Sequence, residues 1–276
     1  MTVKHEGFKT CDQSGFCRRN RAYADNATTL SNTWNSPYAI DSRSVQTNGG
    51  QFSGTILKSL GEGIRSVQLP IKITFLESGA ARVTVDELKR QQKDIELRHG
   101  SQVRKERYNE ASSWALVASE KLDTTAKGKI TDKETIVEYG PNNRYRAIIY
   151  HTPFSIDFFR DNAIQVKFNG NGFLNMEHWR PKIEKAKKEL EESKEGEESQ
   201  AVEEPSEEGE DESTWWEETF GGNTDSKPRG PESVGLDIVF PGYEHVYGIP
   251  GHASSLSLKQ TRYDEPQLPS SISDRY

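Results

Sequence analysis

Apolar and polar residues alternate along several short stretches of the chain, the pattern expected of strands with one buried face. The clearest stretch is "SVQLPIKITF" at 66–75, whose apolar positions on one face are Val67, Leu69, Ile71, Ile73 and Phe75. Pro70 falls on the opposite face. Because proline cannot donate a backbone hydrogen bond to a neighbouring strand, it predicts an edge position or a bulge for this strand.

Turn-forming sequences separate the candidate strands. The alternation recurs at 81–85, 154–158, 164–168 and 236–240. The turn residues occur in "ESGA" (77–80), "GPNN" (140–143), "RDNA" (160–163) and "NGNG" (169–172). The stretch 154–176 therefore predicts two strands joined by a tight turn at Arg160–Ala163, followed by a third short strand. Strands at this spacing favour a mainly β fold, an antiparallel sandwich, over alternating strands and helices.

Two segments have a helix-forming composition, 86–99 and 183–194. The second continues into a strongly acidic stretch, because Glu189 to Glu212 contains thirteen acidic residues and one lysine. No apolar period survives there, so we expect solvated disorder, with a weak calcium site or a docking strip as the alternatives. Trp215 and Trp216 follow, and they should pin the far end of this insertion back onto the same sandwich.

The distribution of charge along the chain argues against a nucleic acid as the partner. The net charge is −7, but without the acidic stretch the remainder is +5 and has no Lys/Arg stripe or aromatic-interleaved basic patch. We therefore expect no nucleic-acid binding. No run of about 18 apolar residues predicts a membrane span. Polar residues follow Met1, which leaves open a cytosolic protein and a secreted chain whose leader has been removed.

The only two cysteines are Cys11 and Cys17, in "CDQSGFC". Gly15 allows a tight turn between them, and the favoured hypothesis is a disulfide. The alternatives are a pair of free thiols and half of a zinc site. Asn26, Ala27 and Thr28 form the only N-x-[ST] sequon. Together the cysteine pair and a glycosylated Asn26 would indicate the secretory pathway.

The segment "PGYEHVYGIPGHA" at 241–253 contains two candidate functional residues, His245 and His252. Their seven-residue spacing, with glycines and a proline nearby, excludes a helix that presents two zinc ligands on one face. A structural loop and a sugar-facing loop are the two interpretations. The chain lacks a G-x-S-x-G nucleophile motif, a P-loop and a G-x-G-x-x-G motif, so we expect no cofactor, no metal and no active site that spacing alone can identify.

Three segments resemble the N-terminal region of endoplasmic-reticulum α-glucosidases of glycoside hydrolase family 31. They are "FKTCDQSGFCRRNR" (8–21), "WEETFGGNTDSKPRGPESVGLDIVF" (216–240) and "YEHVYGIPGHASSLSLKQT" (243–261). The resemblance implies a β-sandwich that leans on a catalytic (β/α)8 barrel, and a disulfide between Cys11 and Cys17. It also implies that the nucleophile and the acid/base are aspartates of a barrel that would follow Tyr276, so we expect no catalytic or substrate-binding residue in this chain.

The resemblance also implies a domain organisation. Residues 1–45 would form a disulfide-containing segment that wraps the sandwich or the barrel, and 46–182 the first part of the sandwich. Residues 183–213 would be the acidic insertion, and 214–276 the second part of the sandwich. Gly251 departs from the acidic residue of many family members, which weakens the expectation that the histidine loop contacts sugar.

The whole enzyme implied by the resemblance is a retaining exo-α-glucosidase of the endoplasmic reticulum lumen. It would remove α-1,3-linked glucose from glucosylated high-mannose N-glycans in glycoprotein quality control, using two carboxylates about 5 Å apart. Its partners would be the remainder of the alpha subunit and a beta subunit that carries a mannose-binding module. The alternatives are a free-standing carbohydrate-binding sandwich of the secretory pathway and a cytosolic scaffold that uses its acidic stretch as bait.

Overall fold

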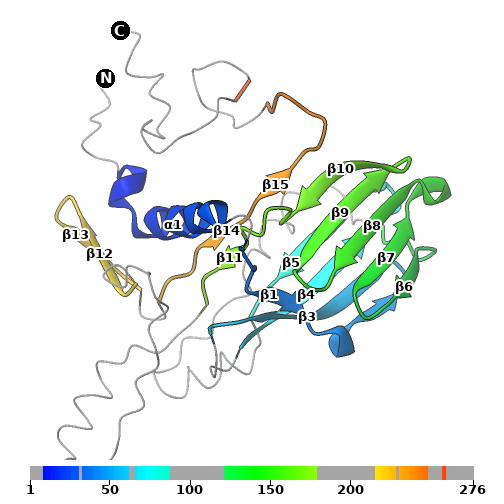
Figure 1. The fold of residues 1–276 in the computed structure, drawn as a ribbon, viewed down its shortest axis with the longest axis horizontal. Helices are drawn as coiled ribbons and strands as arrows, with labels where there is room; N and C mark the ends of the chain where they lie inside the picture. The colour runs from blue at the N-terminus through cyan, green and yellow to red at the C-terminus, as the bar shows by residue number, and fades with distance from the viewer. Residues whose placement is uncertain are drawn as a thin grey trace, which may run out of the picture.

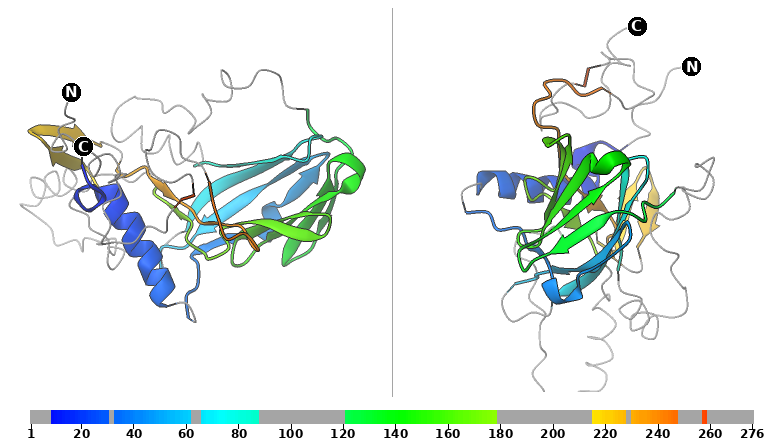
Figure 2. Two further views of the ribbon diagram at one scale, coloured as in Figure 1. Left: turned by 90° about the horizontal axis from the view of Figure 1, so that it is seen from above. Right: turned by 90° about the vertical axis from the view of Figure 1, so that its right-hand side faces the viewer.

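Two antiparallel β-sheets pack face to face, with one α-helix beside them, in this computed structural model (Figures 1 and 2). The structure describes residues 9–30, 33–61, 66–87, 121–178, 215–227, 230–247 and 257–258. The segment 183–194 and nearly all of 86–99, the two expected helices, lie outside the described residues, as does the acidic insertion. The antiparallel β-sandwich expected from the alternating pattern is confirmed.

The first sheet has five strands in the order β1-β3-β4-β5, with β2 also paired to β3. Its strands are β1 (Tyr38–Ile40), β2 (Gln46–Asn48), β3 (Gln51–Lys58), β4 (Val67–Phe75) and β5 (Ala81–Val85). The long ladder between β3 and β4 runs from Gln51 opposite Thr74 to Lys58 opposite Val67 without a register shift. This sheet therefore contributes one continuous inner face.

The second sheet has six strands in the order β15-β10-β9-β8-β7-β6. Its strands are β6 (Lys127–Ile130), β7 (Glu134–Tyr139), β8 (Tyr145–Tyr150), β9 (Ser155–Arg160), β10 (Ala163–Phe168) and β15 (Ile238–Val239). Two small sheets complete the described strands. They pair β11 (Asn175–Met176) with β14 (Val234–Gly235), and β12 (Glu217–Phe220) with β13 (Asn223–Ser226).

The core lies between the inner faces of the two large sheets. Its fully buried side chains include Phe52, Ile56, Leu69, Ile73, Phe75, Ala147, Ile149 and Ile156. Phe75 of β4 meets Tyr139 of β7 across the sandwich, with 4.6 Å between their ring centroids. Each buried aliphatic or aromatic side chain of this kind contributes about 1.5–3 kcal/mol. The alternating positions that the sequence marks in 66–75 and 154–158 therefore supply part of the core, and β3, β7 and β8 supply most of the rest.

Pro70 does not mark an edge strand or a bulge, so that prediction is wrong. β4 lies between β3 and β5, and Pro70 is paired with Thr55 in an unbroken ladder. The Thr55 N–H donates to Ser44 Oγ and its carbonyl accepts from Asp41, both away from β4. The Pro70 carbonyl is directed toward the β5 side and accepts from the Asp86 N–H, one residue past the end of β5 at Val85. Because β5 has ended there, the missing N–H of Pro70 removes no hydrogen bond from the ladder.

The tight turn predicted between β9 and β10 is confirmed. Arg160 pairs with Ala163, so Asp161 and Asn162 form a two-residue hairpin loop. Both have positive φ, 51° and 63°, which is the conformation of a type I′ turn and one that Asp and Asn tolerate better than most residues. The turn therefore sets the register of the first pairs, and the register then shifts between Ile164 and Val166.

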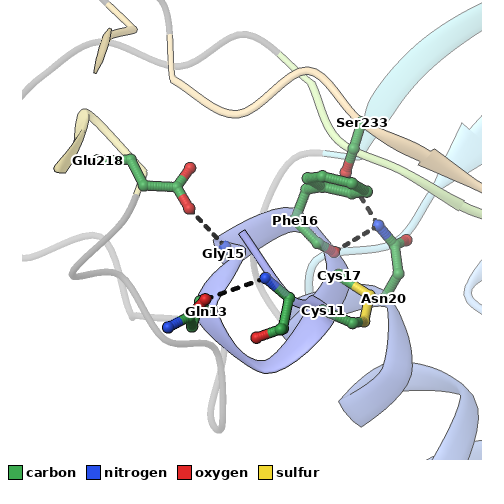
Figure 3. Close-up of a disulfide and its surroundings, with 9 residues drawn as sticks. Cys11, Gln13, Gly15, Phe16, Cys17, Asn20, Glu218 and Ser233 are labelled. Atoms are coloured by element: carbon green, nitrogen blue, oxygen red, sulfur yellow. Dashed lines mark hydrogen bonds between the residues drawn. A yellow bond between two sulfur atoms is a disulfide. The ribbon is translucent and has the colours of Figure 1, made fainter. Parts of the chain in front are cut away.

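The sequence pattern did not predict the helix α1 (Gly15–Thr29). Its buried positions are Gly15, Arg19 and Ala27, which do not form an apolar stripe that alternation or a helical period would reveal. Its N-cap residue Ser14 makes no side-chain capping bond. The free N–H of Gly15 is instead accepted at 2.8 Å by Glu218 Oε1 of β12, far away in sequence (Figure 3). Tertiary contacts therefore supply the cap.

A disulfide closes the loop from which α1 begins. Cys11 lies in a 3-10 turn, η2 (Cys11–Gln13), and Cys17 in the first turns of α1, with 5.3 Å between their Cα atoms (Figure 3). Gln13 Oε1 accepts from the Thr10 N–H at 3.0 Å and so tightens the entry to this loop. The disulfide holds Gly15 in the orientation that reaches Glu218.

Glu218 is buried to 8% exposure and collects three donors. Lys227 Nζ lies 2.8 Å from Oε2, and Lys9 Nζ 3.2 Å from Oε1, beside the Gly15 N–H. Burial opposes ionisation of this carboxyl, but the bonds from Lys227, Gly15 and Lys9 outweigh it and lower its pKa to about 2. The ionised carboxylate therefore ties α1 to the β12–β13 hairpin.

We predict that Gly79→Ala destabilises the sandwich more than Gly222→Ala. Both glycines turn with positive φ, 89° and 81°, but a Cβ at Gly79 would clash with the Tyr145 ring, whereas nothing lies within 4 Å at Gly222. The shared left-handed conformation costs about 1–2 kcal/mol, and overpacking adds about 1–3 kcal/mol at Gly79 only. Urea unfolding followed by tryptophan fluorescence measures both; equal losses would contradict the clash.

We predict that Glu218→Gln removes a pH-dependent part of the stability. The pKa of Glu218 is lowered in the folded chain, so its contribution is complete above about pH 4.5 and is lost as the pH falls toward 2. At pH 7 the variant should be less stable by about 3 kcal/mol, a difference that shrinks on acidification. Unfolding free energies at pH 7, 4 and 3 test this, with Glu77→Gln at an exposed position as the control for loss of a charge. A difference that stays constant with pH would show that the carboxylate acts by packing.

We predict that replacing both cysteines, Cys11→Ser with Cys17→Ser, loosens α1 before the sandwich. Closing so short a loop restricts the unfolded chain by about 2 kcal/mol. Hydrogen exchange should therefore quicken in α1 and stay slow in β4 and β8. A reducing agent should reproduce the change in the native chain and have no effect on the double variant. Uniform loss of protection across both sheets would contradict a local role.

Candidate functional site

A run of exposed apolar side chains begins at β14 and continues past β15; we call residues 234–247 the apolar strip. Ten large apolar residues of the described chain are exposed, and seven of them belong to this strip. They are Val234, Leu236, Ile238, Phe240, Tyr243, Val246 and Tyr247, with exposed fractions from 38% to 64%. Figure 1 shows the strip in orange, beside β10 at one edge of the six-stranded sheet. Exposed apolar groups concentrated in this way mark an interaction surface.

Within the strip, Ile238 is exposed because β15 extends the six-stranded sheet beyond the packed core. Ile238 of β15 pairs with Phe168 of β10, so both side chains point to the same face of the sheet. Phe168 packs against the core, whereas Ile238 is 50% exposed. The expected half-buried strand at 236–240 is therefore reduced to the two residues of β15, and its apolar face is uncovered. The inner face of the larger sheet extends beyond the opposite sheet.

Asp237 fastens the strip to the sheet. Its carboxylate accepts from the backbone N–H groups of Asn171 and Phe173, at 2.8 and 2.9 Å, and its carbonyl accepts from the Asn169 N–H at 2.9 Å. The loop after β10 is therefore held by one side chain of the strip. Alternation in 236–240 places Asp237 on the polar face and gives no sign of this function.

A second carboxylate joins the strip to α1. Glu177 pairs with Arg19 through Oε1, and both side chains are almost completely buried, at 4% and 2% exposure. Its Oε2 accepts from the N–H and the hydroxyl of Ser233, at 2.8 and 2.6 Å. Asn20 of α1 also donates to Ser233 Oγ at 3.0 Å (Figure 3). The start of the strip, β11 and the helix are therefore fixed together without an apolar core.

The structure describes one of the two candidate histidines. His245 lies within the apolar strip, exposed, with its ring 6.2 Å from that of Tyr247. His252 lies outside the described residues. Among the residues that the structure describes, no three His, Cys, Asp or Glu side chains are grouped to hold a metal ion.

The remaining candidate residues lie on or beside α1. Cys11 and Cys17 form the disulfide described above. Asn26 is exposed in the last turn of the helix. No helix of the described chain is both long and apolar enough to cross a membrane.

The buried carboxylates of the described chain all have partners. Asp123 accepts from the Gly140 N–H at 2.6 Å and from Thr125, and these bonds keep its pKa below the usual value in spite of burial. Asp157 faces Lys167 Nζ at 3.5 Å. Glu177 and Glu218 are bound as described above. These four carboxylates serve as structural anchors.

Comparisons with known proteins agree with this picture. Residues 70–265 match the family described as the glycosyl hydrolase 31 N-terminal galactose mutarotase-like domain. The chain is 34% identical over 268 residues to the glucosidase 2 subunit alpha of Schizosaccharomyces pombe, covering 94% of this chain and 26% of that protein. It is 31% identical over 280 residues to neutral alpha-glucosidase AB of Homo sapiens, covering 96% and 26%.

Solved structures show the same relationship. A crystal structure of a glucosidase II alpha subunit with bound Tris has a TM-score of 0.78 and 54% identity, over 94% of this chain and 26% of that one. A complex of the catalytic subunit with the binding domain of the regulatory subunit gives a TM-score of 0.78 and 54% identity over 92% and 25%. The chain thus spans about a quarter of the length of its relatives, and the family match, which covers most of its residues, shows that it belongs to the glycosyl hydrolase 31 N-terminal domain family.

Proposed function

We propose that this chain is the non-catalytic N-terminal portion of the alpha subunit of glucosidase II, and that it stabilises a catalytic barrel through the apolar strip. The observation that carries the proposal is the strip itself. Seven large exposed apolar residues follow one another along a segment that is rigidly fastened by Asp237 and Glu177. A fixed apolar surface of this kind is stable in water only when another surface covers it.

The whole protein would be a retaining α-glucosidase. The relatives that share this domain are alpha-glucosidases, and this chain covers about a quarter of each. The relatives extend far beyond the length of this chain, so the reacting pair of carboxylates would belong to the remainder of the alpha subunit. The substrate would be the α-1,3-linked glucose of high-mannose N-glycans.

The partners and compartment follow from the same relationship. A solved relative binds a domain of its regulatory subunit, which supports a beta subunit as the partner of the whole protein. The disulfide between Cys11 and Cys17 supports an oxidising compartment, the lumen of the endoplasmic reticulum, and a role in glycoprotein quality control. The division into segments 1–45, 46–182, 183–213 and 214–276 is part of the proposal.

Two matched isoleucines test the role of the strip. Ile238 and Ile130 lie on the two opposite edge strands of the same sheet, with 50% and 44% of their surface exposed. Ile238→Ser and Ile130→Ser should each change the unfolding free energy of the 276-residue chain by less than about 1 kcal/mol. In a protein extended to the length of the relatives, only Ile238→Ser should lower the thermal midpoint and the hydrolysis of a chromogenic α-glucoside.

Activity measurements separate the outcomes. The extended protein should hydrolyse the α-glucoside, and the 276-residue chain alone should not. If the chain alone is active, an unrecognised carboxylate pair lies within it and the proposal fails. If the extended protein is active but the two isoleucine variants behave alike, the family assignment stands and the strip is not the interface.

A further inference from the structure

A pocket of about 430 Å³ lies where the C-terminal end of α1 meets the loops at the end of the sandwich. Four segments line it: the last turn of α1, the link between α1 and β1, the turn between β8 and β9, and the loop after β10. Its volume is within the range of about 300–1,000 Å³ that is typical of small-molecule sites. Neither the strip nor the proposed barrel interface makes use of it.

The pocket lining carries no charge among its described residues. Trp34 and Phe173 supply aromatic surface, while Ser36, Ser155 and Asn171 supply hydroxyl and amide groups. A phosphate or a carboxylate would find no cation here. Aromatic surface combined with a few neutral polar groups fits a ligand that has apolar C–H faces and many hydroxyl groups.

The pocket walls are held in place before any ligand binds. The Asn169 side chain holds the loop after β10 through two hydrogen bonds. Its Nδ2 donates to the Phe154 carbonyl at 2.6 Å, and its Oδ1 accepts from the Leu174 N–H at 2.8 Å. Asp237 binds two further N–H groups of the same loop, as described above. A wall fixed in this way loses little conformational entropy when a ligand binds.

The Trp34 ring is fixed on both sides. Its Nε1 donates to the Gly172 carbonyl at 3.3 Å, and its ring packs edge-on against Tyr23, with 5.3 Å between the centroids. Gly172 allows this approach because it turns with a φ of 74° and a Cβ there would lie 3.1 Å from Trp34 Nε1. The half-buried indole therefore offers a rigid aromatic surface to the pocket.

Two polar side chains of the lining remain available. The Asn171 amide and the Ser155 hydroxyl have no hydrogen-bond partner in the described part of the chain, and both line the pocket. An amide donates and accepts, as does a hydroxyl, so each of the two side chains can bind a sugar hydroxyl group. We propose that the pocket binds one pyranose ring of a neutral oligosaccharide, as a non-catalytic site beside the proposed interface.

Titration of the 276-residue chain tests the site. The probes are methyl α-D-glucopyranoside and nigerose, an α-1,3-linked glucose disaccharide, with glucose 6-phosphate as the charged comparison. We expect saturable binding of at least one neutral sugar with a dissociation constant near 1 mM, on the order of 4 kcal/mol. In a two-dimensional NMR spectrum the shifts should concentrate on the Trp34 indole N–H and the amides of Ser155 and Asn171. Glucose 6-phosphate should bind no more tightly.

A double variant localises the binding. Asn171→Ala with Ser155→Ala removes both available groups and should weaken binding at least about tenfold, because each lost hydrogen bond costs about 1 kcal/mol. The matched control replaces the same residue types on the exposed β13 strand, Asn223→Ala with Ser226→Ala, and should leave the affinity unchanged. Unfolding midpoints confirm that both variants fold.

Three results would overturn the site: no saturable binding of either neutral sugar up to about 50 mM, equal weakening by both double variants, or tighter binding of the phosphorylated sugar. None of them bears on the catalytic role of the extended protein, because the titration uses no activity. Failure of the site and failure of the proposed function are therefore distinguishable.

Discussion

The apolar inner face of a β-sheet must be buried against another element. This requirement is met in the core of the sandwich, and it is not met where exposed apolar side chains continue the inner face. The faces of β4 and of β7, β8 and β9 cover one another, and residues such as Ile73 and Ile149 are fully buried between them. β15 extends the larger sheet past this contact, so Ile238 continues the inner face without a covering layer. The exposure of Ile238 within the strip is therefore a consequence of the unequal widths of the two sheets.

Carboxylates replace apolar packing as the means of attachment outside the sandwich core. Glu177 joins α1 and Ser233, Glu218 caps the first turn of α1, and Asp237 holds the loop after β10. Removing one partner from a buried ion pair costs about 3–5 kcal/mol, since the remaining charge is left without compensation. Segments that lack an apolar face can thus be held in fixed positions. Their attachment then depends on single carboxylate residues.

The same distinction explains what could be predicted from the sequence. Strands with a period of two, such as 66–75, and the Asp161–Asn162 turn obey local rules, and the structure agrees with both. The prediction from Pro70 was wrong because proline is tolerated where the neighbouring strand ends. The pairing of β4 with β5 stops at Ile71 opposite Val85, and the sequence of β4 alone does not show this. α1 was missed because its buried positions include an arginine whose partner lies 158 residues away. A contact of that range leaves no local pattern.

The end of the sandwich that carries the strip also carries the uncharged pocket, and the two share a physical character. Of the described charges near them, those on Glu177, Arg19 and Asp237 are already engaged within the chain, whereas the Glu244 side chain of the strip is exposed. A partner would meet apolar surface and this one carboxylate on the strip, and neutral hydroxyl, amide and aromatic groups in the pocket. Long-range attraction between charges would therefore contribute little at the pocket, and screening by salt would remove little there. Burial of apolar area would hold a covering domain, and short hydrogen bonds would orient a sugar ring.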